Sequence, residues 1–208
     1  MNRRRPPPLL TGILAFAGIL AFAASGARAG SADEMSLGDP KSPVTVIEYA
    51  SLGCSHCGAW AREVFPQFKK RFIDTGRVRF VLREMLTGDP AVAAAGFLTA
   101  RCAPKDKYFQ VVDDLFDAQP RMEREGDDMP ALLDVAARAG LTKAQVAACL
   151  SDHAALAALE TRVEANASEN HVDGTPEFDV AGRRFTGETS LAVLASAIDA
   201  AVPAPRRR

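Results

Sequence analysis

The stretch VTVIEYASLGCSHCGAW, residues 44–60, decides how the rest of the chain is interpreted. Its β-branched first half, led by a proline, predicts a strand over residues 42–51. Cys54 and Cys57 follow where this strand gives way to a helix. Two cysteines at this spacing are typical of half a metal site, a structural disulfide or a redox centre. The choice depends on the compartment and on the neighbouring residues.

The segments around the cysteines predict a strand–helix–strand unit. Aromatic and apolar residues recur at spacings near three and four from Trp60 to Phe72, which indicates an amphipathic helix. Pro66 lies inside this pattern and should kink the helix. Residues 78–85 (VRFVLREM) predict a second strand. A strand, a helix and a strand in this order indicate parallel strands with a right-handed crossover.

The chain then becomes alanine-rich with helical periodicity, and strand character returns near residue 177. Because the late strands complete the first sheet, we expect an α/β fold with helices inserted between its two halves. The expected helices lie at residues 91–102, 105–118, 131–139, 143–151, 153–169 and 189–201, with a polar loop at 119–130. The expected late hairpin turns at Ala181–Gly182.

The N-terminus has the pattern of a secretory signal peptide. Arg3–Arg5 precede an apolar run, Leu9–Ala24, and an A-x-A pattern ends at Ala29. The run is shorter than the roughly 20 residues that span a bilayer. An uncleaved anchor is the alternative. Export would place the chain in an oxidising compartment, where disulfides persist. The net charge of −1 gives no indication of nucleic-acid binding.

The surroundings of Cys54 and Cys57 favour redox chemistry over the two alternatives. A helix N-terminus lowers a cysteine pKa, and His56 can add a positive charge. A structural zinc site needs about four ligands, whereas the pair supplies two and His153 and His171 are far along the chain. A disulfide within so short a loop would stabilise the fold little. A thiol-based metal-handling protein stays as the alternative from another class.

Two further features of the sequence are candidates for functional residues. Pro176, in Gly174-Thr175-Pro176, begins a late strand and is a candidate for a cis peptide bond. Glu48 lies in the middle of the first strand, where burial would raise its pKa and let it exchange protons with a cysteine. An ordinary loop proline and a solvent-exposed edge-strand glutamate are the simpler interpretations.

Together these motifs resemble the DsbA family of thiol–disulfide oxidoreductases, which have a thioredoxin fold with an inserted α-helical domain. The similarity covers nearly the whole chain from Leu37 to about Val202. It rests on VIEYASLGCSHC, the kinked helix with Pro66, and GTP before the late strand. A C-x-x-C motif alone would not be specific.

The resemblance implies roles for individual residues. Cys54 would be the nucleophile and Cys57 the resolving cysteine, with Ser55 and His56 tuning the pair. Glu48 would assist proton transfer.

Other roles follow from the same resemblance. Thr175 and Pro176 would form a cis-proline loop that binds the substrate backbone. The four cysteines allow three pairings, and Cys102 with Cys149 resembles a second, structural disulfide of some bacterial members. The sequence departs from the family pattern at Glu177, next to Pro176, where an acid beside the active site would raise the cysteine pKa.

The resemblance also implies a function and partners. We expect a monomeric periplasmic enzyme, without cofactor or metal, that donates its disulfide to reduced secreted proteins. A DsbB-like quinone-linked membrane oxidase would reoxidise it. A periplasmic isomerase or reductase is the alternative within the superfamily. The expected organisation is a signal peptide (1–29), a linker (30–41), the first thioredoxin half (42–88), the helical insertion (89–170), the second half (171–202) and a basic tail (203–208).

Overall fold

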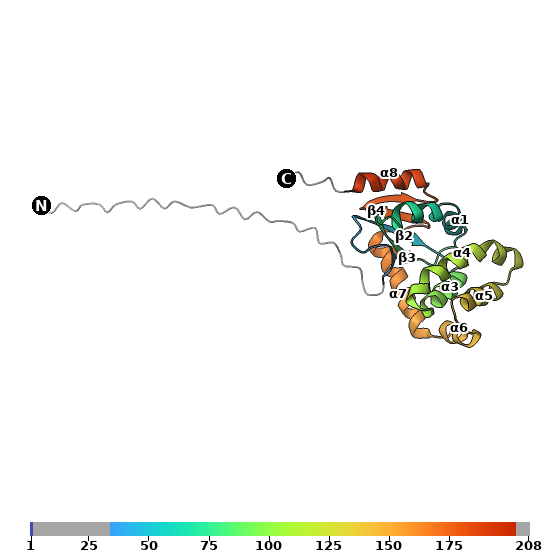
Figure 1. The fold of residues 1–208 in the computed structure, drawn as a ribbon. Helices are drawn as coiled ribbons and strands as arrows, with labels where there is room; N and C mark the ends of the chain where they lie inside the picture. Colours follow the sequence, from blue (N-terminus) through green and yellow to red (C-terminus); the bar gives the residue numbers. More distant parts are fainter. Residues whose placement is uncertain (2–33, 203–208) are drawn as a thin grey trace. The chain divides into compact units, whose positions relative to one another are not determined.

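The structure is a computed structural model that describes Met1 and residues 34–202 (Figure 1). Apart from Met1, the expected signal peptide (1–29) and basic tail (203–208) lie outside the described residues. In the described part of the chain, no helix has both the length and the apolar character needed to cross a bilayer.

The core of the fold is a mixed five-stranded sheet in the order β1-β3-β2-β4-β5. The strands are β1 (Met35–Leu37), β2 (Val44–Ala50), β3 (Val78–Glu84), β4 (Glu177–Val180) and β5 (Arg183–Thr186). The central strand β2 pairs in parallel with β3 and antiparallel with β4. The predicted α/β fold with parallel β2 and β3 is therefore confirmed.

The strand β1 lies within the segment for which the sequence predicted a linker. Met35 and Leu37 alternate with a polar residue, and both pack on the core. Met35 pairs with Leu82 of β3 in antiparallel register. The prediction missed this strand because three residues carry too little periodicity to stand out.

The helical segment after the cysteines is broken near Pro66, where the sequence predicted a kink. It consists of α1 (Ser55–Glu63), α2 (Phe65–Phe68) and a π-helical turn (Lys69–Ile73). Pro66 lies in the first turn of α2, where its missing N–H costs no hydrogen bond. The break lets Trp60, Phe65 and Phe68 share one aromatic cluster.

The helical insertion runs from β3 to β4. Its helices are α3 (Pro90–Cys102), α4 (Tyr108–Glu125), α5 (Met129–Arg138), α6 (Lys143–Leu150) and α7 (His153–Asn170), with a 3₁₀ turn (Lys105–Lys107) before α4. The last helix, α8 (Leu191–Ala201), follows the sheet. The segments match the predicted helices except at α4.

The predicted loop at residues 119–130 was wrong, because α4 continues through Pro120 to Glu125. Pro120 has no N–H to donate to the Phe116 carbonyl one turn earlier. The Arg62 guanidinium of α1 donates to that carbonyl at 2.6 Å instead. The helix ends at Gly126, whose φ of 68° suits glycine.

Helices cover both faces of the sheet (Figure 1). The face that carries Val46, Phe80 and Phe178 packs against α1, α2 and α8 in the main core. The opposite face carries Tyr49, which packs with Ala167 of α7 in a smaller cluster.

A disulfide holds the insertion to itself, and a buried carboxylate holds it to the sheet. Cys102 at the end of α3 and Cys149 of α6 form a disulfide with their Cα atoms 6.3 Å apart. Glu84 of β3, 2 % exposed, accepts hydrogen bonds from Arg101, Tyr108 and Arg162. A buried carboxylate is tolerated when it is paired and hydrogen-bonded in this way.

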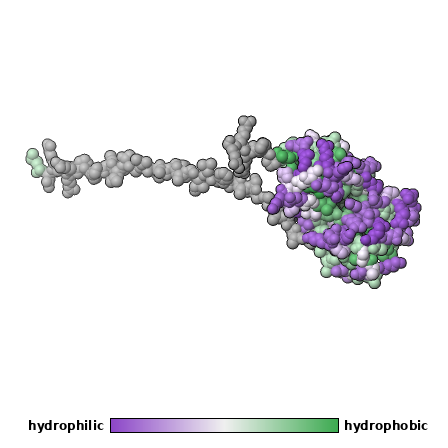
Figure 2. Space-filling view, viewed as in Figure 1, coloured by the Kyte–Doolittle hydropathy of each residue, from purple (hydrophilic) through white to green (hydrophobic). Residues whose placement is uncertain are grey.

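The surface is mostly polar. Figure 2 shows polar side chains over most of the visible face, with apolar patches between them. Within residues 34–202, the large exposed apolar side chains are Met129, Val193 and Val202.

Candidate active site

The two cysteines lie where the sequence predicted, at the junction of the central strand and α1. A short turn follows β2, and Cys54 caps α1 with φ −104° and ψ 115°. Cys54 is 8 % exposed and Cys57 is fully buried, and both are free thiols. Of the two cysteines, Cys54 is therefore the one that reaches the surface.

The surroundings of Cys54 stabilise its thiolate. A hydrogen bond from the Cys57 thiol lowers the Cys54 pKa most, and burial opposes it. The Thr175 side chain and the backbone N–H groups of Cys57 and His56 lower it further. The resulting pKa of about 5 makes Cys54 a thiolate at neutral pH.

Cys57 has the opposite environment. Burial raises its pKa most, and hydrogen bonding to Cys54 and the nearby charges of Glu48 and Cys54 raise it further. The reduced pair therefore consists of one accessible thiolate and one buried thiol. This difference suits Cys54 for attack on a partner and Cys57 for re-forming the Cys54–Cys57 disulfide.

The loop before β4 faces Cys54 from the opposite side of the site. The Thr175–Pro176 peptide bond is cis. The Cys54 thiol can donate to the Thr175 carbonyl, 3.4 Å away. Thr175 and Thr87 share a hydrogen bond between their hydroxyls. The loops after β3 and before β4 thus meet beside the cysteines.

The other side chains of the motif point outward. Ser55 and His56 are exposed. His56 Nδ1 lies 2.6 Å from Glu188 Oε1, and this contact raises the His56 pKa. Glu188 precedes α8, and no sequence pattern links it to the cysteines.

Glu48 is buried on the face that carries the cysteines. It is 3 % exposed, and its Oε1 has no hydrogen-bond partner among the described residues. Burial raises its pKa well above the usual value, and the charges of Asp113 and Cys54 add to this. A protonated carboxyl so placed can donate a proton.

Gln119 of α4 is a further site residue that sequence reasoning missed. Its buried amide donates to the carbonyls of Leu52 at 2.8 Å and Cys54 at 3.2 Å. A Cβ at Gly58 would lie 1.7 Å from Gln119 Oε1, so a larger residue there would displace the Gln119 amide. No local signal connects residues so far apart in the sequence.

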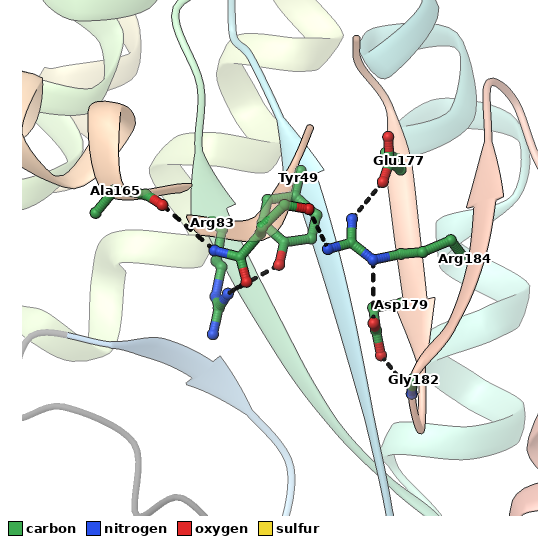
Figure 3. A network of polar contacts seen from close by, with 8 residues as sticks. Tyr49, Arg83, Ala165, Glu177, Asp179, Gly182 and Arg184 are labelled. Atoms are coloured by element: carbon green, nitrogen blue, oxygen red, sulfur yellow. Dashed lines mark hydrogen bonds and ion pairs between the residues drawn. The ribbon is translucent and has the colours of Figure 1, made fainter. Parts of the chain in front are cut away.

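Glu177 faces away from the cysteines, in the polar network that Figure 3 shows. Its carboxylate pairs with Arg184, which also pairs with Asp179 at 3.1 Å. The Arg184 guanidinium lies over the Tyr49 ring, 4.8 Å from its centre. This pairing neutralises the acid whose charge was expected to raise the cysteine pKa.

The described residues contain no group of three or more His, Cys, Asp and Glu side chains placed to hold a metal ion. The arrangement can instead exchange a disulfide, because it joins an accessible thiolate, a buried thiol and a buried acid.

Comparisons with known proteins agree with this geometry. The model of a family described as Thioredoxin matches residues 31–200. A Rickettsia conorii protein named "Putative protein-disulfide oxidoreductase" is 29% identical over 171 residues. The match covers 82% of this chain and 61% of the relative, so the chain spans less than two thirds of that protein.

Solved structures share the fold. The chain resembles alpha-DsbA1 of Wolbachia pipientis with a TM-score of 0.74 at 24% identity, over 82% of this chain and 92% of that chain. It resembles oxidised BdbD of Bacillus subtilis with a TM-score of 0.73 at 21% identity, over 81% and 92%. The predicted thioredoxin fold with a helical insertion is confirmed.

Proposed function

The chain belongs to the thioredoxin family and has the fold of DsbA proteins, and from this premise we propose that it is a protein thiol–disulfide oxidoreductase. We further propose that it donates the Cys54–Cys57 disulfide to reduced secreted proteins. The observation that carries the proposal is the contrast between the two sulfurs. The Cys54 pKa is lowered to about 5, whereas the Cys57 pKa is raised.

This contrast favours donation of the disulfide over reduction of a substrate. A thiolate with a pKa of about 5 stabilises the reduced pair at pH 7, relative to a thiol with a pKa of 9.0. The gain is roughly 3 kcal/mol, because about two pKa units separate pH 7 from the lowered pKa. It corresponds to roughly 60 mV for a two-electron couple. A pair that prefers to be reduced is an oxidant.

The proposed reaction proceeds through a mixed disulfide. A substrate thiolate attacks Cys54 Sγ, which forms a bond to the substrate and breaks the Cys54–Cys57 bond. Cys57 leaves as a thiolate and takes up a proton, for which Glu48 is the proposed donor. A second substrate thiolate attacks the substrate sulfur of the mixed disulfide, and Cys54 leaves as a thiolate. Two electrons pass from the substrate to the enzyme.

The neighbouring residues have supporting roles in this proposal. Thr175 and Pro176 would contact the substrate backbone, because their loop adjoins Cys54. Ser55 and His56 would tune the pair from the exposed first turn of α1. Cys102 and Cys149 would only stabilise the insertion, since their disulfide joins two of its helices, α3 and α6.

The proposed setting follows from the resemblance to DsbA proteins. We propose that the chain is exported by a signal peptide at residues 1–29 and acts in the periplasm as a monomer. A DsbB-like quinone-linked membrane oxidase would return the pair to the disulfide state.

Oxidative refolding of a reduced secreted protein tests the function. The purified protein, preoxidised at Cys54–Cys57, is mixed with equimolar reduced substrate, and free thiols are followed with time. We expect loss of substrate thiols with matching gain at Cys54 and Cys57. Cys54→Ser should be inactive, whereas Cys57→Ser should trap the mixed disulfide when the substrate carries an activated disulfide. No transfer to the substrate would contradict the proposal.

A second assay separates the alternative functions. A substrate with scrambled disulfides, given to the reduced protein, reports isomerase or reductase activity. Stoichiometric zinc or copper that is lost in Cys54→Ser/Cys57→Ser would support metal handling instead.

A further inference from the structure

The carboxyl group of Glu48 has no partner within the sheet. Its neighbours in register are Leu82 on β3 and Phe178 on β4, both apolar. Its Oε1 has no hydrogen-bond partner among the described residues, although the side chain is 3 % exposed. An orphaned buried polar atom carries a free-energy cost of about 1–3 kcal/mol, so a role other than stability is indicated.

One other acid reaches the same space. Asp113 of α4 and Glu48 of β2 line one cavity, whose remaining walls are apolar and include Trp60, Phe109 and Phe116. Among the described residues, no lysine, arginine or histidine lines this cavity. Asp113 itself is half-buried, so part of this residue reaches solvent. A buried acid and a partly exposed acid therefore line one apolar space.

The charges around Asp113 suit exchange of a proton near neutral pH. Burial raises its pKa to about 7, the charges of Asp117 and Asp114 add to this, and Lys69 opposes them. Two of these three neighbours are themselves paired with an opposite charge. Asp114 pairs with Arg138 at 3.2 Å, and Lys69 pairs with Asp74 at 2.6 Å.

The charges that face Glu48 come from two sides. Asp113 lies on the α4 side, and the cysteine pair lies at the start of α1, where Cys54 adds its negative charge. Glu48 in turn acts on Cys57, whose pKa its charge raises. The electrostatic coupling thus runs from Asp113 to Glu48 and from Glu48 to Cys57.

We propose that Asp113 is a positioning residue that acts through Glu48, passing protons between solvent and the buried cysteine across the cavity that both acids line. The inference rests on the proposed exchange function and adds the route by which Cys57 gains its proton. Asp113 touches neither sulfur, so it changes the rate of protonation and leaves the sulfur chemistry to the cysteines.

The protons and electrons balance along this route. Attack of the substrate thiolate on Cys54 leaves the electron pair of the broken bond on Cys57 Sγ. The proton of the Glu48 carboxyl group moves to that sulfur and leaves Glu48 as a carboxylate. The proton of Asp113 then restores Glu48, and water restores Asp113. When the pair is reoxidised, Cys57 loses its proton by the reverse path.

The test compares Asp113→Asn with Asp117→Asn. Asn keeps the size of Asp113 and cannot carry the proton. Asp117 is exposed on the same helix and does not line the cavity, so its substitution removes a charge near Asp113 and leaves both acids of the route in place. The rate at which dithiothreitol reduces the Cys54–Cys57 disulfide of each oxidised protein is measured at pH 5.5–8.5. Each rate is divided by the thiolate fraction of dithiothreitol at that pH, which gives the normalised rate.

For wild type, we expect the normalised rate to fall as pH rises through about 7, the Asp113 pKa. For Asp117→Asn, we expect the same fall at a lower pH, because the Asp117 charge raises the Asp113 pKa. For Asp113→Asn, we expect no inflection and a rate at pH 6 that is lower by about tenfold, a modest effect for acid–base catalysis. The equilibrium between oxidised and reduced pair should change less than threefold. Equal profiles for the two variants would overturn the proposal, and so would a changed equilibrium with an unchanged profile.

A second measurement separates failure of the relay from failure of the function. Carbon-13 NMR of the side-chain carboxyl of Glu48 in the reduced protein gives its titration without any substrate. We expect a lower Glu48 pKa in Asp113→Asn than in Asp117→Asn, because the Asp113 charge raises it. Identical Glu48 titrations would overturn the coupling. A wild-type disulfide that does not react with dithiothreitol would instead overturn the proposed function.

Discussion

Gln119 of the helical insertion donates a hydrogen bond to the carbonyl of Cys54, 3.2 Å away, at the point where the central strand turns into α1. The same amide donates to Leu52 at 2.8 Å. The insertion therefore holds the backbone of the active-site turn, in addition to the hydrogen bonds that Ser51 accepts from Gly53 and Cys54 within the turn. This contact makes the helical insertion part of the site.

Replacement of Gln119 should loosen the turn. Gln119→Met keeps the length of the side chain and removes the donor to the buried Leu52 carbonyl, together with one of the two donors to the Cys54 carbonyl. We expect the free energy of unfolding to fall by about 2 kcal/mol. Urea unfolding of the oxidised protein measures this change. Gln145→Met is the control in an exposed helix cap, where the loss should be about 1 kcal/mol or less. Equal losses at the two positions would contradict the role of Gln119.

The Cys54 thiol should titrate with a pKa of about 5. Thr175→Val removes a hydroxyl that lowers this pKa, so we expect a higher value in the variant. Ultraviolet absorbance of the thiolate, followed against pH in the reduced protein, measures both. The oxidised protein is the blank. A Cys54 pKa near 9 would contradict the account of the site.

The same pKa predicts how the reduced and oxidised proteins differ in stability. The folded pKa of Cys54 is lowered, so its contribution is fully present above the unfolded value of 9.0 and is lost as pH falls through about 5. We expect the free energy of unfolding of the reduced protein, minus that of the oxidised protein, to fall between pH 8 and pH 4. Denaturant unfolding at each pH measures it. A difference that rises over this range would have the wrong sign.

Glu48 should lower stability at high pH. Its folded pKa is raised, so the group begins to destabilise the fold once pH exceeds the unfolded value of 4.5, and the effect grows until pH passes the folded pKa. Glu48→Leu, between Leu82 and Phe178, should raise the free energy of unfolding at pH 8 by about 2 kcal/mol, and less at pH 4. Glu48→Gln is the matched polar control. A destabilised Leu variant at pH 8 would show that the carboxylate is needed for the fold.

The Cys102–Cys149 disulfide should stabilise the fold without affecting exchange. It joins residues 47 positions apart. In the chain-entropy model, its loss costs about 4 kcal/mol of unfolding free energy. The double variant Cys102→Ala/Cys149→Ala, compared with wild type in urea, measures this cost. Exchange at Cys54 should be unchanged under native conditions, and a loss of exchange in the folded variant would contradict a structural role.

Local patterns predicted most of the fold. The β-branched strand before Cys54, the broken helix at Pro66 and the alanine-rich helices are each visible within one window of sequence. The thioredoxin fold then follows from the order of these segments. The prediction failed at α4, because the bond that tolerates Pro120 comes from Arg62 on another helix.

The site was less accessible to prediction. The cysteines and Thr175-Pro176 belong to recognisable motifs, whereas Gln119, Asp113 and Glu188 act through contacts between distant segments. No local sequence feature distinguishes a buried glutamine or aspartate on an amphipathic helix from a solvent-exposed one. The packing of the insertion on the sheet brings Gln119 and Asp113 to the site, and the segment before α8 brings Glu188.

The redox equilibrium of Cys54 and Cys57 against glutathione tests the central claim most directly. Mass spectrometry after thiol alkylation follows this pair and Cys102–Cys149 separately. We expect the Cys54–Cys57 disulfide to be reduced far more easily than a pair at about −270 mV, the value for thioredoxin. Its potential should fall by about 30 mV per pH unit above pH 5, since one proton accompanies two electrons. A pair as hard to reduce as thioredoxin's would contradict the disulfide-donor account and favour a reductase.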